Sequence, residues 1–127
     1  MGRPVVFVVS ADAAVSDSVK NLVESAGLPA ETFRSLQIFL DALEPGRRGC
    51  LVLDTYISDL RDPQWQSRLA AAYTLIPGLL ITDRGDVQTA VRAVKAGAMD
   101  VVQKPYRDEN LLDSINKALQ ADATAQR

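Results

Sequence analysis

Short apolar runs alternate with amphipathic stretches along the whole chain. Four runs rich in Val, Ile and Leu have the length and composition of strands that are buried on both faces. They are PVVFVV (4–9), CLVLD (50–54), PGLLIT (77–82) and MDVVQ (99–103). The segment AETFR (30–34) predicts a fifth, weaker strand. Apolar residues at helical spacing follow each predicted strand, so the pattern indicates a β-α unit repeated five times.

The amphipathic stretches predict helices over 13–27, 36–43, 63–73, 87–97 and 108–120. Ser35, Asp62 and Asp86 are the predicted N-caps of the second, third and fourth helices. Pro63 suits the first position of the third helix, and Gly27 suits the C-terminal cap of the first. The helix boundaries are therefore marked by capping residues as well as by periodicity.

This alternation predicts an α/β fold with a parallel sheet between two layers of helices, which is a three-layer sandwich. Because crossovers between parallel strands are right-handed, few strand orders remain. We predict the flavodoxin-like, doubly wound order 2-1-3-4-5. Ligands of such sheets bind beyond the carboxyl ends of the strands, beside the first strand, where the order reverses.

Polar residues stand where the predicted strands reach that edge. The first strand ends at Ser10 and is soon followed by Asp12, and the third ends at Asp54. The fourth strand ends at Thr82, and Lys104 follows the fifth, directly before a proline. An acid, a hydroxyl and an ammonium therefore converge on one edge. We expect Lys104 to face Asp54.

Composition narrows the chemistry that this edge can carry. The chain has no histidine, which excludes Ser–His catalysis, histidine metal sites and a phosphohistidine carrier. Cys50 is the one cysteine and lies in an apolar run, so a disulfide within the chain is excluded and a buried, inert thiol is expected.

Length and charge indicate one domain without a nucleic-acid or membrane surface. Of the 127 residues, 47% are hydrophobic and 24% charged, enough for one core, which we place in residues 1–120. The small, polar residues 121–127 predict a C-terminal tail or a linker to an output domain outside this chain. With a net charge of -2 and scattered basic residues, no direct contact with nucleic acid is expected. No apolar run has the length of a signal peptide or membrane span, so we expect a cytoplasmic protein.

From about Pro4 to Leu119 the chain resembles the receiver (CheY-like) domains of two-component response regulators. It is most similar to receivers joined to helix-turn-helix transcription factors of the LuxR/FixJ kind. The motifs that carry the resemblance are LVLD ending at Asp54, LLITDRGDVQTAVRAVKAGAMD (79–100), and Lys104 with its following proline. The resemblance implies that residues 1–120 form a signal receiver with the CheY-like version of the predicted fold.

The resemblance also implies roles and partners. Asp54 matches the aspartate that accepts a phosphoryl group from a sensor histidine kinase, Thr82 the hydroxyl that moves toward the phosphate, and Lys104 the lysine that pairs with it. The Lys104–Pro105 bond matches one that is commonly cis. A DNA-binding output domain would lie outside this chain. The implied surface for a homodimer or for contact with that domain comprises the helix at 87–97, the strand at 99–103 and the helix at 108–120.

The metal pocket departs from the family pattern. Ser10 and Ala11 stand where most receivers have two adjacent acids that hold Mg²⁺. Asp12 comes one residue late and either reaches the metal through a water molecule or caps the first helix. Asp12 and Asp54 are then the available metal ligands, and we predict weak or absent Mg²⁺ binding. Val101 replaces an aromatic switch residue of the fifth strand.

The loop after Asp54 departs as well. Its sequence, TYISDLRDP (55–63), lacks the Pro and Gly that are usual there. Tyr56 and Arg84 occupy the variable positions that flank the mouth of the pocket. Arg84 either reaches a phosphate or stays in solvent.

Three functional interpretations follow. In the first, the receiver accepts a phosphoryl group at Asp54 with the help of Thr82 and Lys104. Its affinity for metal is weak. In the second, a degenerate receiver acts through protein contacts without phosphate, either as input to a transcriptional output domain or as a stand-alone interaction or dimerisation module. The third is a small α/β enzyme or flavin binder. It is the poorest, because no glycine-rich phosphate loop follows the first strand, and we expect no enzyme beyond self-catalysed phosphoryl acceptance and release.

Overall fold

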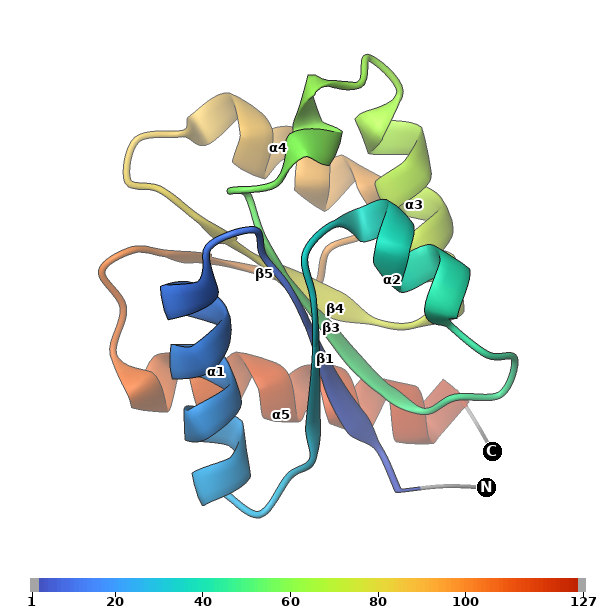
Figure 1. Cartoon of the computed structure of the whole chain (residues 1–127), viewed down its shortest axis with the longest axis vertical. Coiled ribbons are helices and arrows are strands. Elements are labelled where there is room, and N and C mark those ends of the chain that lie inside the picture. The colour runs from blue at the N-terminus through green and yellow to red at the C-terminus, as the bar shows by residue number, and fades with distance from the viewer. Residues whose placement is uncertain (1–2, 126–127) are drawn as a thin grey trace.

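Five parallel strands form one twisted sheet in the order β2-β1-β3-β4-β5, as predicted (Figure 1). The computed structural model describes residues 3–125. All four neighbouring strand pairs run parallel, so the carboxyl ends of the strands lie at the same edge of the sheet. The strands are β1 (Val5–Val9), β2 (Ala30–Phe33), β3 (Gly49–Asp54), β4 (Gly78–Thr82) and β5 (Asp100–Gln103).

Helices cover both faces of the sheet, which gives the predicted three layers (Figure 1). α1 and α5 pack on one face, and α2, α3 and α4 pack on the other. The helices are α1 (Ala13–Ser25), α2 (Leu36–Ala42), α3 (Trp65–Leu75), α4 (Val87–Ala96) and α5 (Asp108–Ala125), with a short 3₁₀ helix η1 (Ser58–Arg61) before α3. Within residues 3–125, none of these helices has the length and apolar character needed to span a membrane.

Alternation along β1 explains the two halves of the core. Val5, Phe7 and Val9 face α2, α3 and α4, whereas Val6 and Val8 face α1 and α5. Successive side chains of a strand point to opposite faces, so a run of apolar residues fills both layers. The sheet is thereby fixed from both sides, and its carboxyl edge is held in place.

The predicted caps of three helices are present. The side chain of Asp12 accepts a hydrogen bond from the Ala14 amide at 2.9 Å, and Ser35 accepts one from Ile38 at 3.1 Å. Asp86 caps α4 in the same way at a longer 3.4 Å. Each cap satisfies an amide that has no partner inside the helix. Of the two roles considered for Asp12, the structure shows the capping one.

The predicted start of the third helix was wrong. α3 begins at Trp65, after Gln64, rather than at Pro63, and the 3₁₀ helix η1 was not predicted. Asp62 does not cap α3, because its carboxylate accepts the amide of Gln64 at 2.9 Å and pairs with Arg68 at 3.0 Å. These contacts, and the bond from the Trp65 amide to the Asp62 carbonyl, close a turn before the helix begins.

The last helix is longer than predicted. α5 continues past residue 120 to Ala125, so most of the predicted tail is helical, while residues 126–127 lie outside the described part of the chain. Asp122 explains the extension, since it is buried and accepts a 2.9 Å hydrogen bond from the amide of Gly49. A linker to an output domain stays a prediction.

Candidate functional site

Polar side chains gather at the carboxyl edge of the sheet. Asp54 is the last residue of β3 and Thr82 the last of β4, and both are fully or almost fully buried. Ser10 directly follows β1 and is also buried. Lys104 directly follows β5, and its amide donates to the Thr82 carbonyl at 2.9 Å, which fixes its position beside β4. The edge thus brings together the residues predicted from the strand ends.

The predicted contact between Lys104 and Asp54 is present. The lysine Nζ lies 2.9 Å from Oδ1 of Asp54, whose side chain is only 1% exposed. The approach is poorly directed for a hydrogen bond, so the contact is best described as an ion pair. Asp83, largely exposed, lies 3.7 Å from the same Nζ. The Lys104–Pro105 peptide bond is cis.

Ser10 supplies the second partner of Asp54. Its hydroxyl donates to Oδ2 of Asp54 at 2.7 Å. The same hydroxyl oxygen accepts the amide of Asp12 at 3.0 Å, which orients it toward the carboxylate. Sequence reasoning did not find this role, because a serine at a strand end is common and its partner lies 44 residues away. The position where an acid was expected therefore carries a hydrogen-bond donor.

Charge around the pocket favours the protonated lysine. Burial lowers the pKa of Lys104, but the close contact with the Asp54 carboxylate and its charge, together with the charges of Asp83 and Asp12, outweigh it. The net effect is a pKa raised above its ordinary value of 10.5. Lys104 is therefore a fixed positive charge at physiological pH.

The hydroxyl of Thr82 lies in the same region without a hydrogen-bond partner among the described residues. The residue is fully buried at the end of β4. A buried hydroxyl usually has a partner, so an unpaired one marks a place where a further acceptor would be stabilised.

Protein groups already contact several of the oxygens that a divalent cation would need. Asp54 pairs with Lys104 and Ser10, and a carboxylate oxygen of Asp12 accepts the Ala14 amide. The carbonyl of Tyr56 accepts the amide of Ala11 at 2.9 Å. Across residues 3–125, no group of three or more acidic, cysteine or histidine side chains is arranged to hold a metal ion. Mg²⁺ prefers several oxygen ligands, and with Ser10 and Ala11 this pocket offers it fewer anionic ligands than the family pattern would.

The two residues at the variable positions of the pocket mouth are both exposed to solvent. Tyr56 is 64% exposed, and Arg84 is exposed as well. Val101, which replaces the expected aromatic residue, is half-buried and packs against the core on the side of α2, α3 and α4. A shallow cleft of about 290 Å³ lies beside Tyr56 and is lined by Ala11 and Arg61 among others.

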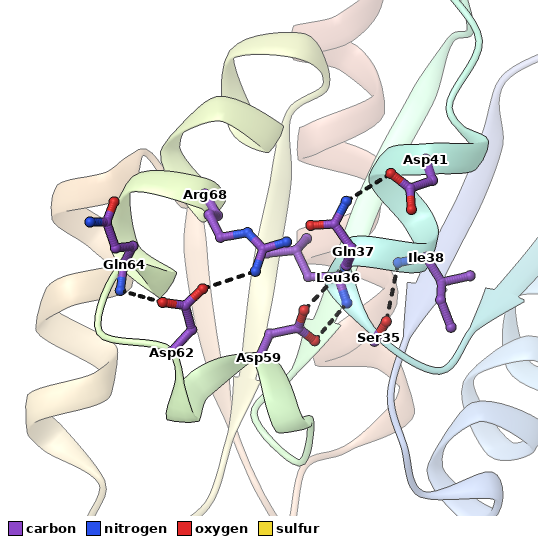
Figure 2. A network of polar contacts seen from close by, with 9 residues as sticks. All are labelled: Ser35, Leu36, Gln37, Ile38, Asp41, Asp59, Asp62, Gln64 and Arg68. Atoms are coloured by element: carbon purple, nitrogen blue, oxygen red, sulfur yellow. Dashed lines mark hydrogen bonds and ion pairs between the residues drawn. The ribbon is translucent and has the colours of Figure 1, made fainter.

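The loop after Asp54 is anchored by a carboxylate that sequence analysis missed. Asp59, in η1, is buried and accepts hydrogen bonds from the amides of Leu36 at 2.8 Å and Gln37 at 3.1 Å (Figure 2). No local signal marks Asp59, because its partners lie in α2. The loop that lacks the usual Pro and Gly is thus held by a side chain.

α4 presents an apolar stripe to solvent. Val87, Val91 and Val94 are 61%, 47% and 54% exposed, and they line a shallow hollow with Lys95 and Gln103. Only Ala93 of this helix is fully buried. An amphipathic helix normally turns its apolar side inward, so this stripe is a candidate contact surface.

The fold and the aspartate, hydroxyl and lysine at the sheet edge define a CheY-like signal-receiver domain. The chain belongs to the response regulator receiver domain family, whose model matches residues 6–116. It is 41% identical over 114 residues to the transcriptional regulatory protein TdiR of Thauera aromatica. The aligned segment covers 90% of this chain and 50% of TdiR. Over 121 residues it is 38% identical to the transcriptional regulatory protein FixJ of Bradyrhizobium diazoefficiens. This alignment covers 94% of this chain and 59% of FixJ.

Solved structures agree with this assignment. The low-resolution structure of response regulator StyR superposes with a TM-score of 0.86 at 39% identity, covering 98% of this chain and 63% of StyR. Full-length FixJ from B. japonicum superposes with a TM-score of 0.82 at 35% identity, covering 99% of this chain and 62% of FixJ. The chain spans about half the length of the curated relatives it matches.

Proposed function

We propose that this receiver domain controls a transcriptional output domain chiefly through protein contacts, with a pocket that works without a bound divalent cation. The observation that carries the proposal is the state of Asp54. Its two oxygens already have Ser10 and Lys104 as partners. The acceptor carboxylate is satisfied by the protein itself, so the resting pocket requires no metal.

Electrostatic reasoning supports this interpretation. Several carboxylates close together repel one another and attract a divalent cation. Here Ser10 and Ala11 are neutral, and the charge of Asp54 is balanced by Lys104 at 2.9 Å. Asp12 and Asp83 add negative charge only at greater distance or in solvent. The excess negative charge that would draw in Mg²⁺ is therefore small, and we propose weak or absent binding.

The partners follow from the family and from the relatives. TdiR and FixJ are transcriptional regulatory proteins about twice as long as the matched segment. We therefore propose that a sensor histidine kinase and a DNA-binding output domain are the partners of this chain, in a cytoplasmic setting. The α4 stripe, with β5 and α5, is the proposed surface for homodimerisation or for contact with the output domain. It does not depend on rotation of an aromatic residue, because position 101 is valine.

Phosphoryl acceptance at Asp54 is the second candidate function. The unpaired hydroxyl of Thr82 favours it, because that hydroxyl could donate to a phosphoryl oxygen. In this reaction an Asp54 oxygen forms a bond to phosphorus while the donor's bond to phosphorus breaks, and the donor leaves with the electron pair. The hydrogen bond from Ser10 would draw electron density from Oδ2 and make it a weaker nucleophile. Lys104 would neutralise part of the charge on the transferred group.

Acetyl phosphate labelling distinguishes the two candidates. The wild-type protein, an Asp54→Asn control and a Ser10→Asp/Ala11→Asp variant would be incubated with acetyl phosphate and millimolar Mg²⁺. Intact-mass spectrometry then follows addition of one phosphoryl group. We expect slow or absent labelling of the wild type and faster labelling of the acidic variant, with none in the control. Ready labelling of the wild type at Asp54 would contradict the phosphate-independent interpretation and support the second candidate.

A further inference from the structure

The loop after Asp54 is fixed at the end nearer the pocket. The Thr55 amide donates to the Ile81 carbonyl at 3.1 Å, and the Tyr56 carbonyl accepts the Ala11 amide at 2.9 Å. Ile57 is buried in the core beneath the loop. Any shift of the chain at Tyr56 therefore involves both the pocket and the β1–α1 connection.

At its other end the loop is joined to α2 by Asp59. Figure 2 shows the carboxylate directed at the first turn of the helix, where each oxygen takes one amide: Leu36 at 2.8 Å and Gln37 at 3.1 Å. Asp59 lies 23 positions from Leu36, so this is a tertiary cap, supplied by a different element. Ser35 provides the local cap by accepting the Ile38 amide at 3.1 Å.

The short length of α2 makes these caps important. The helix has seven residues and so few internal hydrogen bonds. Short helices are marginal without tertiary support, and their first amides need outside acceptors. The carboxylate also interacts favourably with the positive end of the helix dipole. The first turn of α2 therefore depends on the position of η1.

We propose that Asp59 couples the loop after Asp54 to α2, so that the two move as one unit. A displacement of the loop would withdraw the carboxylate and loosen the first turn of α2. By reciprocity, a partner that ordered or loosened α2 would alter the loop over the pocket. The coupling requires neither phosphate nor metal, so it does not depend on the proposed function. Through Asp59, α2 responds to the state of the pocket.

Hydrogen exchange by NMR tests the coupling, with two variants that each remove an α2 cap. Asp59→Ala removes the tertiary cap, and Ser35→Ala is the matched control that removes only the local one. In Asp59→Ala we expect the Leu36 and Gln37 amides to exchange about tenfold faster or more, as the loss of a bond to a charged acceptor implies. The Ala11 and Ile57 amides, which report on the loop, should accelerate as well.

In Ser35→Ala, acceleration should be confined to α2. Wild-type rates for Ala11 and Ile57 in Asp59→Ala, or their equal acceleration in both variants, would overturn the proposal. Asp59→Asn, which preserves the side-chain volume, gives the same comparison if the alanine variant does not fold. Uniform acceleration of all amides in that variant, including those of β3, would also contradict the coupling, because Asp59 would then be only a global stabiliser.

Discussion

At the scale of the residue, the partners of Asp54 decide the chemistry of the pocket. Its carboxylate is buried and charged, which is unfavourable unless both oxygens have partners. Lys104 provides a charge and Ser10 a neutral donor. An acid at position 10 would instead repel Asp54, and the two negative charges would attract a cation. In our proposal, the serine therefore replaces the need for a metal with a hydrogen bond.

Replacing Ser10 with alanine tests that balance. The change removes a donor to a buried carboxylate, so we expect the free energy of unfolding to fall by about 2 kcal/mol. In an Asp54→Asn background the loss should be smaller, since the amide carries no charge. Urea denaturation of the four proteins gives the coupling between the two positions. Equal losses in both backgrounds would show that Ser10 acts independently of Asp54.

Alkaline titration tests the pairing of Lys104. Its pKa is raised in the folded state, so the folded protein holds this proton more tightly than the unfolded chain. The resulting stabilisation is fully present below the ordinary pKa of 10.5 and is lost as pH rises through the folded pKa. The free energy of unfolding should therefore fall more steeply above about pH 10.5 in the wild type than in Lys104→Met. Parallel curves would exclude a stabilising role for the charge.

At the scale of the element, side chains far apart in sequence set the ends of helices. Asp122 lies near the C-terminal end of α5, where the helix dipole disfavours an acid. It is nevertheless buried, because it accepts the Gly49 amide and lies 3.7 Å from Arg48. A side chain at Gly49 would collide with the Val5 carbonyl, so the backbone approaches closely there. α5 is thus attached to the beginning of β3.

Asp122→Ala should therefore destabilise the protein by about 2 kcal/mol, since it leaves the Gly49 amide buried and unpaired. Asp113→Ala is the matched control on the same helix, because Asp113 is exposed and its loss should change the stability by less than about 0.5 kcal/mol. Thermal or urea unfolding measures both. Similar values for the two variants would mean that Asp122 does not attach α5 to the sheet.

The distance along the chain between a residue and its partner explains which contacts the sequence could predict. Asp12 and Ser35 were predictable as caps because their partners lie two or three residues away. Ser10, Asp59 and Asp122 were not, since their partners lie 44, 23 and 73 residues away in the chain. Nothing local distinguishes such residues from solvent-exposed ones. Only the assembled fold supplies their partners.

The candidate site itself was largely predictable, for a topological reason. Parallel strands place their carboxyl ends at one edge, so Asp54, Thr82 and Lys104 had to lie near one another once the strand order was known. The start of α3 was not predictable from Asp62 and Pro63, because Arg68 and the Gln64 amide compete for the carboxylate. A local capping signal fails where other nearby groups take the carboxylate before the helix begins.

At the scale of the whole molecule, the pocket and the α4 stripe are separate surfaces of different chemical character. The pocket is polar and lies at the sheet edge, whereas the stripe is apolar and faces solvent along α4. In our proposal a second copy of the chain, or the output domain, covers the stripe. Burial of exposed valines would supply the driving force.

Val91→Lys should weaken self-association through this surface, because it places a charge in the centre of the apolar stripe. Leu75→Lys is the matched control, since Leu75 is an exposed apolar residue of α3 outside the stripe. Sedimentation velocity over a range of protein concentrations measures the association of each variant. An effect of Leu75→Lys as large as that of Val91→Lys would place the contact elsewhere.

Calorimetric titration with Mg²⁺ tests the central claim most directly. If Ser10 and Lys104 satisfy Asp54, the wild-type protein should show no sub-millimolar binding. The Ser10→Asp/Ala11→Asp variant should gain affinity, because it restores the carboxylates that a hard cation prefers. Asp54→Asn in that variant should abolish the gain. Sub-millimolar binding of Mg²⁺ by the unmodified protein would contradict the account.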